Sequence, residues 1–412
     1  MRVALFVIIA IAFVPLVVFW GFWFLLVVLA WGPRRRRRDM PWNPAWTKFN
    51  IDILIPAHNE QAALPGLLES LKKQNAPEIL GAVVVVADHC TDQTADIARS
   101  AGFIAMERNS GPPGKPGALR EGLAFLRNRP HGDAVLFIDA DCVATDNLLG
   151  QMAWALGAGH PVSQSAYVLQ QEDSNGLSGS VRWGFALKNV IRPIGLDRLG
   201  LPCQLFGTGM MMRYDVLEHV KFEDHLVEDL RMSHSLLLAG VRPKFLPQVT
   251  LVSAMPVDES GLTTQRLRWE GGQFETWKSL PSVAARLLAR GNWRGLLALV
   301  DWSAPPLAMA AFVWFVLACI TGACVGAGLV SPLALACPAL SAVFLAGYLV
   351  VGITAAGNPG DLWLVIRTAP RFLRWKLQVY GGMFCGRRAS TWQRTPRAAA
   401  TVQNSPATEK PV

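Results

Sequence analysis

The longest hydrophobic stretches of the chain lie near its two ends. Val3–Trp31 contains no charged residue, and a helix of that length, rising about 1.5 Å per residue, can span a hydrocarbon core of about 30 Å. Pro305–Leu329 and Leu333–Ala356 form two further apolar stretches. The pattern predicts one transmembrane helix before a central domain and two after it. A cleaved signal peptide is the alternative for the first stretch, but its apolar region would be shorter and would follow its positive charge.

Three short apolar runs in the central region are each followed by polar residues. They are Ile51–Ile55, Val83–Ala87 and Val135–Ile138, and helical-looking sequences, Gln61–Gln74 and Asp92–Ala101, separate them. Near-continuous apolar runs alternating with helices are typical of parallel strands buried on both faces. Because ligands bind beyond the carboxyl ends of such strands, the sequence predicts an α/β domain with a nucleotide site at that edge.

Positive charge is concentrated directly after the first apolar stretch. Arg34 to Arg38 are five consecutive arginines, against the lone Arg2 on the other side. Arginine-rich loops stay in the cytoplasm, so we expect the N-terminus outside and the central domain in the cytoplasm. The net charge of +9 also permits nucleic-acid binding. Much of that charge belongs to this one run, which attracts anionic lipids, so we expect a membrane partner and no nucleic acid.

The segment Leu362–Phe384 differs from the apolar stretches because basic residues recur among its aromatic ones. Its cations would be costly at the centre of a transmembrane helix. The pattern therefore favours an amphipathic helix lying in the membrane interface. The seven cysteines form no C-x-x-C pair and have no His-rich partner cluster, so the sequence gives no support to a zinc or iron–sulfur site.

Acidic residues stand where two of the predicted strands end. Asp139 and Asp141 follow the third run, and their two hard carboxylates suit Mg²⁺ or Mn²⁺, which also takes oxygens from a diphosphate. An acidic surface pair is the alternative. Asp88 ends the second run and could accept a hydrogen bond from a uracil or a ribose hydroxyl. The alternative for Asp88 is a helix N-cap, for which Thr91 and Asp92 are better placed.

Further polar residues could line the same nucleotide pocket. His58, Asn59 and Glu60 follow the first strand, although Glu60 alternatively only stabilises the first turn of a helix. Lys115 lies in a segment rich in glycine and proline, residues 111–117. That segment lacks the phosphate-loop spacing, and its prolines remove amide donors. Lys115 could still approach a diphosphate.

Asp229 is the candidate general base, because displacing a nucleotide from a sugar requires a carboxylate that deprotonates the attacking hydroxyl. Glu228 and Asp229 also open a helical run, Leu230–Leu238, so stabilisation of that helix is the alternative. At a distance of 36 residues from Asp229 begins a Gln-x-x-Arg-Trp motif. Its residues Gln265, Arg268 and Trp269 share one helix face, where an arginine can bind phosphate with two donors. An interfacial basic-aromatic helix is the alternative.

Together these segments resemble the inverting family 2 glycosyltransferases, particularly the membrane group of cellulose, chitin and hyaluronan synthases and bacterial exopolysaccharide enzymes. The resemblance covers about residues 50–275, in the family's order. The matching stretches are Ile55-Pro56-Ala57-His58-Asn59-Glu60, Asp88 with Thr91-Asp92, Gly114-Lys115, Asp139-Ala140-Asp141, Glu228-Asp229 and Gln265-x-x-Arg268-Trp269.

The resemblance implies a GT-A fold with a mostly parallel sheet, a nucleotide-sugar donor that is most often UDP-linked, Mg²⁺ or Mn²⁺, and inversion to a β-linkage. On this sequence it assigns the catalytic dyad to Glu228 and the base Asp229, and the metal to Asp139 and Asp141. Further residues fall at the donor, and others at the diphosphate and acceptor. The donor set is Pro56, His58, Asn59, Glu60, Asp88, Lys115 and Asp139; the second set is Gln265, Arg268, Trp269 and, from Phe206-Gly207-Thr208-Gly209, Gly207.

The chain departs from this group in two ways. Two transmembrane segments after the catalytic region are few for a processive synthase, and Val227 stands where many members have Thr. Addition of one sugar to a lipid-linked saccharide is therefore expected as much as growth of a glycan. The resemblance places either reaction in exopolysaccharide assembly at a bacterial inner membrane, where partner subunits of a synthesis complex are a further expectation. A glycolipid synthase with a diacylglycerol- or ceramide-type acceptor and a catalytically idle synthase subunit are the alternatives.

These observations predict a division of the chain into segments. The expected parts are an N-terminal transmembrane helix (1–33), a basic linker (34–47), a GT-A domain (48–300), two transmembrane helices (303–357), an interfacial helix (358–386) and a basic tail (387–412).

Overall fold

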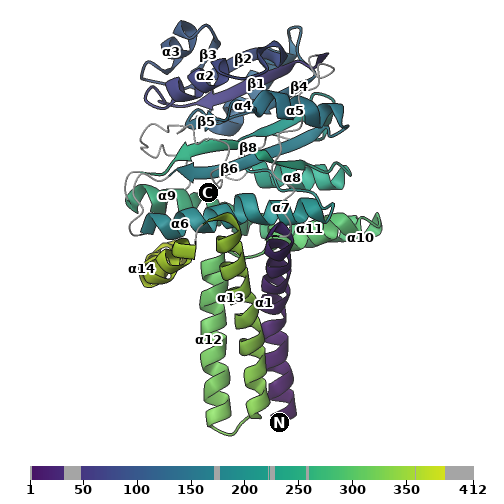
Figure 1. Ribbon diagram of the computed structural model, residues 1–412, viewed down its shortest axis with the longest axis vertical. Coiled ribbons are helices and arrows are strands. Elements are labelled where there is room, and N and C mark those ends of the chain that lie inside the picture. The colour runs from purple at the N-terminus through teal and green to yellow at the C-terminus, as the bar shows by residue number, and fades with distance from the viewer. Residues whose placement is uncertain are drawn as a thin grey trace.

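The computed structural model describes residues 2–31, 48–170, 177–220, 222, 228–256, 259–357 and 359–385. An α/β domain stands above a bundle of long helices (Figure 1). The arginine run 34–38 within the linker, Val227 and the tail 387–412 lie outside the described residues, so the predictions for them stay predictions.

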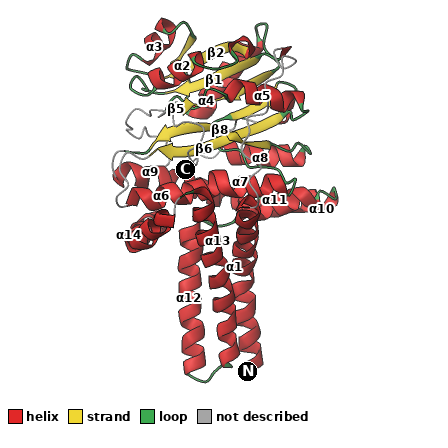
Figure 2. Cartoon of the chain, viewed as in Figure 1, coloured by secondary structure: helices red, strands yellow, loops and turns green. Residues whose placement is uncertain are grey.

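One eight-stranded mixed sheet forms the centre of the α/β domain, in the order β3-β2-β1-β4-β7-β6-β8-β5. The strands, in yellow in Figure 2, are β1 (Ile51–Ala57), β2 (Leu80–Asp88), β3 (Ile104–Arg108), β4 (Ala134–Phe137), β5 (Cys142–Ala144), β6 (Val162–Gln170), β7 (Met210–Arg213) and β8 (Lys244–Ala254). The three strands predicted from the apolar runs are confirmed as β1, β2 and β4, and both neighbours of β1 are parallel to it. The sheet is less parallel than predicted, because β7 pairs antiparallel with both β4 and β6, and β5 pairs antiparallel with β8.

Helices cover both faces of this sheet, as the alternation within β1 requires. Ile53 and Ile55 point to the face covered by α2 (Leu64–Lys72) and α5 (Leu148–Gly157). Leu54 points to the opposite face, where α4 (Lys115–Arg127) and α8 (Glu228–Leu238) pack. Successive side chains of a strand alternate between faces, so a strand that is apolar at both must be covered on both. The smaller α3 (Thr94–Ser100) packs beside β3.

A layer of helices separates the sheet from the long bundle (Figure 1). The segment between β6 and β7 and the segment after β8 supply it. Its members are α6 (Leu177–Ala186), a π-helical turn (Leu187–Ile191), α7 (Arg192–Arg198), α9 (Glu259–Trp277), α10 (Leu280–Ala289) and α11 (Trp293–Ser303). Short 3₁₀ turns lie at Pro77–Ile79, Val216–His219 and Pro332–Leu335.

Three of the described helices are long and apolar enough to cross a membrane. They are α1 (Arg2–Trp31), α12 (Leu307–Gly326) and α13 (Ala336–Ala356). Helices α1 and α13 pack closely: the Trp23 and Tyr348 rings lie 5.3 Å apart, and a Cβ at Gly347 would come within 2.7 Å of Phe24. Small residues permit such close approach between membrane helices.

The last described helix, α14 (Pro359–Phe384), lies beside the upper end of α12 and below α6 (Figure 1), and it contacts α6, α9 and α13. It is amphipathic, as the sequence predicts. Its buried Lys376 pairs with the buried Glu270 of α9, and Trp375 Nε1 donates to Thr263 Oγ1 at 2.9 Å. The helix is therefore fastened to the α/β domain at the level where the apolar helices begin. Its predicted place in a membrane interface stays a prediction.

Candidate active site

A cavity of about 840 Å³ begins at the carboxyl edge of β1, β2 and β4 and continues down to the apolar helices. Most of the residues predicted from the sequence line it. They are Pro56, His58, Glu60, Asp88, Lys115, Asp139, Asp141, Gly207, Glu228, Asp229, Arg268 and Trp269. Asn59 and Gln265 do not belong to its lining. The expectation that distant motifs converge beyond the strand ends is therefore met for twelve of fourteen residues.

The acidic pair Asp139 and Asp141 lies just beyond the end of β4. Ile138 extends that strand by donating its N–H to the Leu54 carbonyl at 3.1 Å, and the chain then turns into the cavity. The Asp139 N–H donates to Thr208 Oγ1 at 3.0 Å, which ties the acidic pair to the loop 206–209. Both carboxylates line the cavity, so strand end and loop together present two hard oxygen donors at one place.

Lys115, the first residue of α4, joins three parts of the site. Its Nζ lies 2.6 Å from Asp139 Oδ1, 2.9 Å from the Gly207 carbonyl and 3.5 Å from Glu228 Oε1. Burial favours the neutral amine, but the carboxylates of Asp139 and Glu228 outweigh it and raise the pKa of Lys115 above its ordinary value. The lysine therefore stays protonated at neutral pH and holds the acidic pair close to the start of α8.

Gly207 lies against the candidate base because its backbone is left-handed, with φ of 81°. A Cβ at this position would lie 3.3 Å from Lys115 Nζ and 3.6 Å from Asp229 Oδ2. Glycine adopts positive φ without the steric cost that other residues pay. The loop thus requires glycine both for its conformation and for its close approach to two charged groups.

Asp229 lies in the first turn of α8, so the alternative role of helix stabilisation is compatible with the predicted one. Its Oδ1 accepts the Leu230 N–H at 2.8 Å, at the helix end where the dipole favours negative charge. Burial, and then the neighbouring charge of Glu228, raise the pKa of Asp229 to about 6, although Lys115 opposes this shift. A carboxylate with this pKa is ionised at neutral pH and binds a proton more strongly than an ordinary aspartate, as a general base requires.

Arg268 and Trp269 reach the cavity from α9, whereas Gln265 does not. The Trp269 ring packs 5.8 Å from the ring of Phe185, and the Arg266 guanidinium lies 5.2 Å from the Trp269 ring centre. Gln265 is buried, and its amide nitrogen and oxygen make no hydrogen bond within the described residues. The shared helix face is therefore divided: its indole and one arginine meet the cavity, and its glutamine packs into the protein.

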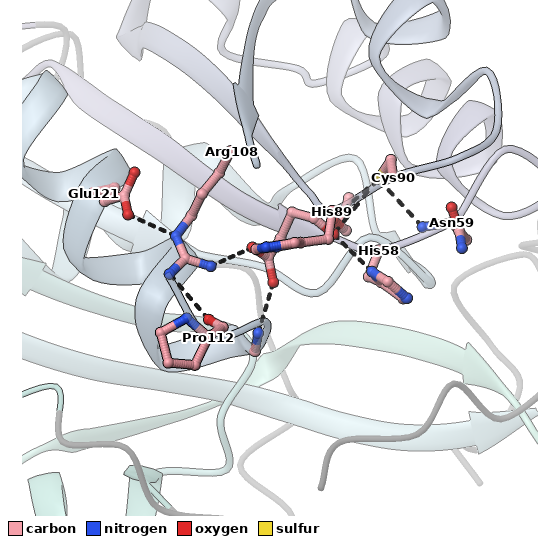
Figure 3. Close-up of polar contacts among 10 residues, drawn as sticks. His58, Asn59, His89, Cys90, Arg108, Pro112 and Glu121 are labelled. Carbon is pink, nitrogen blue, oxygen red and sulfur yellow. Dashed lines mark hydrogen bonds and ion pairs between the residues drawn. The ribbon is translucent and has the colours of Figure 1, made fainter. Parts of the chain in front are cut away.

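The Asp88 carboxylate is held by the protein itself. It is buried and pairs with Arg108, accepts the Gly114 N–H at 2.7 Å and lies 2.9 Å from His89 Nδ1. Arg108 also donates to Glu121 Oε1 at 2.6 Å and to the Pro112 carbonyl at 3.0 Å (Figure 3). This network fixes the glycine- and proline-rich loop over the cavity. Since a carboxylate accepts about four hydrogen bonds, Asp88 keeps little capacity for a nucleotide.

His58 and Asn59 shape the neighbouring turn after β1. His58 Nδ1 lies 2.6 Å from the Asp88 carbonyl oxygen, and its ring lines the cavity. Asn59 has a positive φ of 55°, and its Oδ1 accepts the Thr91 N–H at 2.7 Å, which connects the turns after β1 and β2. Neither Thr91 nor Asp92 is the N-cap of α3, which is Gln93, although Asp92 Oδ1 accepts the Thr94 N–H at 3.0 Å. Asn59 therefore supports the pocket from behind its lining.

Comparison with known proteins decides the family. The family model described as "Glycosyltransferase like family 2" matches residues 50–272, more than half of the chain. The chain belongs to this family. It is therefore a glycosyltransferase, and the resemblance drawn from its motifs is confirmed.

Individual relatives of the glycosyltransferase include enzymes of polysaccharide synthesis. It is 24% identical to the poly-beta-1,6-N-acetyl-D-glucosamine synthase of Staphylococcus epidermidis over 245 residues, 55% of each chain. It is 24% identical to the probable glycosyltransferase YdaM of Bacillus subtilis over 254 residues, 56% of this chain and 57% of that one. It is 36% identical to the poly(ribitol-phosphate) beta-N-acetylglucosaminyltransferase TarS of Staphylococcus aureus over 99 residues, 23% of this chain and 16% of that one. The glycosyltransferase thus spans between a sixth and somewhat more than half of the lengths of these relatives.

A solved structure supports the fold along nearly the whole glycosyltransferase. The mannosyltransferase PcManGT from Pyrobaculum calidifontis, solved in complex with GDP-Man and Mn²⁺, superimposes with a TM-score of 0.55 at 19% identity. The match covers 92% of this chain and 99% of that one. The α/β domain of the glycosyltransferase therefore has a GT-A-like fold.

The donor set of the glycosyltransferase fits a divalent cation that is completed by a ligand. Asp139 and Asp141 supply two carboxylates, and no group of three or more His, Cys, Asp or Glu in the described residues could hold a metal ion alone. Mg²⁺ and Mn²⁺ commonly take their remaining ligands from water and substrate phosphates. The residues present therefore fit a metal that binds together with a diphosphate.

Three cations of the glycosyltransferase that belong to the site or its support lie outside the motifs identified in the sequence. Arg108 organises Asp88, while Lys188 and Arg192 line the lower cavity. The signal for the last two was a lysine and an arginine four residues apart within the stretch 185–196, where Asn189 is the one other polar residue. Such a pair is easily taken for a solvated helix face, and only the packing of α6 and α7 over the apolar helices shows that it faces a cavity.

Proposed function

We propose that this glycosyltransferase transfers a sugar from a UDP-sugar to a lipid-linked saccharide or a growing glycan at the inner face of a bacterial cytoplasmic membrane, with inversion to a β-linkage. The observation that carries the proposal is the convergence of Asp139, Lys115, Glu228 and Asp229 around one cavity. Lys115 lies 2.6 Å from Asp139 and 3.5 Å from Glu228, the residue directly before the proposed base Asp229.

The upper cavity would hold the donor. Pro56, His58 and Glu60 line it beside the Asp88 network, and would flank the nucleotide. Asp139 and Asp141 would hold Mg²⁺ or Mn²⁺. The cation supplies charge neutralisation for the diphosphate leaving group. Lys115 then has two tasks: it keeps the acidic pair in place before the donor arrives and offers a cation to the diphosphate afterwards.

Asp229 would remove the proton from the attacking hydroxyl of the acceptor. The acceptor oxygen bonds to the anomeric carbon from the side opposite the diphosphate, the bond from that carbon to the phosphate oxygen breaks, and the proton stays on Asp229 until solvent takes it. The pKa of about 6 suits this exchange, because the base is ionised before attack and holds the proton afterwards. Displacement from the opposite side inverts the anomeric centre.

Arg268 and Trp269 would complete the site from below. Arginine binds phosphate oxygens with two donors, and an indole offers an apolar face to a sugar ring. Both side chains line the cavity, with Trp269 braced by Phe185 and Arg266. We assign them to the leaving diphosphate and to the wall of the acceptor site. The role of Gln265 in the same motif would require a movement of its side chain out of the interior.

The three described apolar helices, and the extension of the cavity to them, support the proposed membrane location. The reactive end of a lipid-linked acceptor could enter the cavity while its lipid stays in the membrane. Among the described residues, α12 and α13 are the two apolar helices after the catalytic region, and the proposal takes single addition to a lipid-linked acceptor as its first case. Partner subunits of a synthesis complex could supply what a polymer would need.

The test is nucleotide release by the detergent-purified protein across a panel of UDP-sugars, with GDP-mannose as a further donor, in the presence of Mg²⁺ or Mn²⁺. Release from one UDP-sugar that requires metal and is absent in Asp229→Asn supports the proposal. Release from GDP-mannose only would overturn the choice of nucleotide. Release that persists in Asp229→Asn would remove that residue from the role of base.

A further inference from the structure

The lower half of the cavity carries cations that the proposed donor chemistry leaves unused. Lys188 belongs to the π-helical turn, Arg192 begins α7, and Arg266 lies on α9. All three line the cavity below Asp229. The nearby carboxylates are already engaged: Asp301 pairs with Arg192 at 3.2 Å, and Glu270 pairs with Lys376. Within the described residues, Lys188 and Arg266 therefore form no ion pair with a carboxylate.

Lys188 makes no hydrogen bond or ion pair in the part of the chain that the structure describes, and its side chain is accessible from the cavity. Desolvation by the surrounding protein and the charge of Arg192 lower its pKa to about 8. Like charges four residues apart on a helix destabilise it, and π-helical turns frequently occur at functional sites. An unpartnered ammonium held beside an arginine is the arrangement that an anionic ligand would stabilise.

The guanidinium groups of Arg192 and Arg266 each pack against an aromatic ring. The Arg192 guanidinium lies 4.4 Å from the ring centre of Trp23 in α1, and Arg266 lies 5.2 Å from that of Trp269. The Nε atoms of both arginines have no hydrogen-bond partner within the described residues. These two Nε donors are buried, so each guanidinium carries hydrogen-bonding capacity that the described protein atoms do not satisfy.

Below these cations the cavity wall becomes apolar. Trp23 of α1, Leu307 of α12, and Leu349 and Ile353 of α13 line it at the ends of the apolar helices nearest the α/β domain. A neutral glycan would neither pair with the cations nor pack against this apolar wall. A free phosphate would satisfy the cations alone. A lipid with an anionic head would satisfy both, with the chain among the helices.

We infer that Lys188, Arg192 and Arg266 form a subsite for the phosphate or diphosphate of a membrane-lipid acceptor, whose hydrocarbon chain lies against α1, α12 and α13. This inference rests on the proposed function, because it places the lipid phosphate between the membrane and Asp229. The sugar hydroxyl linked to that phosphate then reaches the base from below, while the donor occupies the upper half.

The test measures equilibrium binding to the full-length protein in detergent, with four probes: farnesyl phosphate, farnesyl diphosphate, farnesol and inorganic pyrophosphate. One charge-assisted contact changes affinity by about tenfold or more. We expect both farnesyl phosphates to bind at least tenfold more tightly than farnesol and than pyrophosphate. Lys188→Gln should remove most of the difference from farnesol, Lys188→Arg should retain it, and Lys73→Gln, an exposed lysine distant from the cavity, should leave it unchanged.

Equal binding of farnesol and its phosphates would overturn the inference, as would pyrophosphate binding as tight as that of farnesyl diphosphate, which would indicate a soluble anion. The wild-type comparison needs no variant. If Lys188→Gln does not fold, Arg266→Gln provides the second test, and a phosphate preference that survives in the folded variant places the subsite elsewhere. Binding is measured without transfer, so a phosphate preference with no sugar release from any donor would defeat the proposed function and leave the subsite standing.

Discussion

The upper half of the cavity, called the donor half below, and the lower half, called the membrane half, differ in how their cations are neutralised. In the donor half, two cations have carboxylate partners: Lys115 lies between Asp139 and Glu228, and Arg108 between Asp88 and Glu121. In the membrane half, Lys188 and Arg266 have no ion pair within the described residues. In the donor half, Lys115 neutralises carboxylates that a bound metal cation would neutralise in its place. A site with surplus charge is ready for an anion that the protein does not contain.

The largest effect expected from this comparison concerns the acidic pair. Asp141→Ala removes one of two proposed metal ligands, so metal-dependent binding of UDP should fall at least about a hundredfold. Binding of farnesyl phosphate should stay within about twofold, because the lower half does not use the metal. Calorimetric titration of both ligands checks this. A parallel loss of both would show that the halves are not independent, and unchanged UDP affinity would move the metal site elsewhere.

The next effect concerns the attachment of α14 to the membrane half. Glu270→Gln leaves the buried Lys376 without its partner, and removing one member of a buried pair costs about 3–5 kcal/mol. The matched control is Glu259→Gln, whose pair with Arg371 is more than half exposed on both sides and should cost less than about 1 kcal/mol. Thermal unfolding in detergent compares them. Similar losses in both variants would contradict the buried character of this contact.

A smaller effect is expected in the pH dependence of the donor half. The pKa of Asp229 is raised to about 6, mainly by burial, so its base form is complete at pH 7 and is lost as the pH falls through 6. The value of kcat/KM should then decrease about tenfold per pH unit below that point. A profile that stays level down to pH 5 would exclude this titration from the rate.

The smallest effect separates conformational strain from contact with the base. Gly207→Ala and Gly240→Ala both place a side chain at positive φ, 81° and 76°, but only Gly207 faces Lys115 and Asp229, whereas Gly240 has open space. Both should lose about 1 kcal/mol of stability. Only Gly207→Ala should also lose turnover, by several-fold. Equal turnover in the two variants would remove the loop 206–209 from the catalytic geometry.

The donor half was predictable because its residues interrupt apolar strands at fixed places. Asp88 and Asp139 stand at strand ends, and parallel strands bring such residues to one edge. Their partners were less accessible to sequence reasoning. The Asp88 carboxylate pairs with Arg108, and Gln265 lies outside the cavity that Arg268 and Trp269 line. Both facts depend on packing between elements, which sequence periodicity alone does not predict.

The membrane half could be predicted only in outline. Apolar runs gave α1, α12 and α13, because membrane helices require length and hydrophobicity and little else. The segment from α6 to α7 carries no motif, and the four-residue β7 is too short to show a strand period, so neither the surplus cations nor the antiparallel centre of the sheet was visible. Lys188 becomes informative only where the fold sets it over the bundle.

The central claim is that Asp229 takes the proton of the acceptor beside a donor site that works without it. Single-turnover sugar transfer, together with UDP binding, in wild-type protein and Asp229→Asn tests this most directly. The account predicts that the variant binds UDP with Mn²⁺ within about twofold of wild type while transfer falls by about 10²–10⁴-fold. Transfer by Asp229→Asn within about tenfold of wild type, at unchanged UDP affinity, would contradict it.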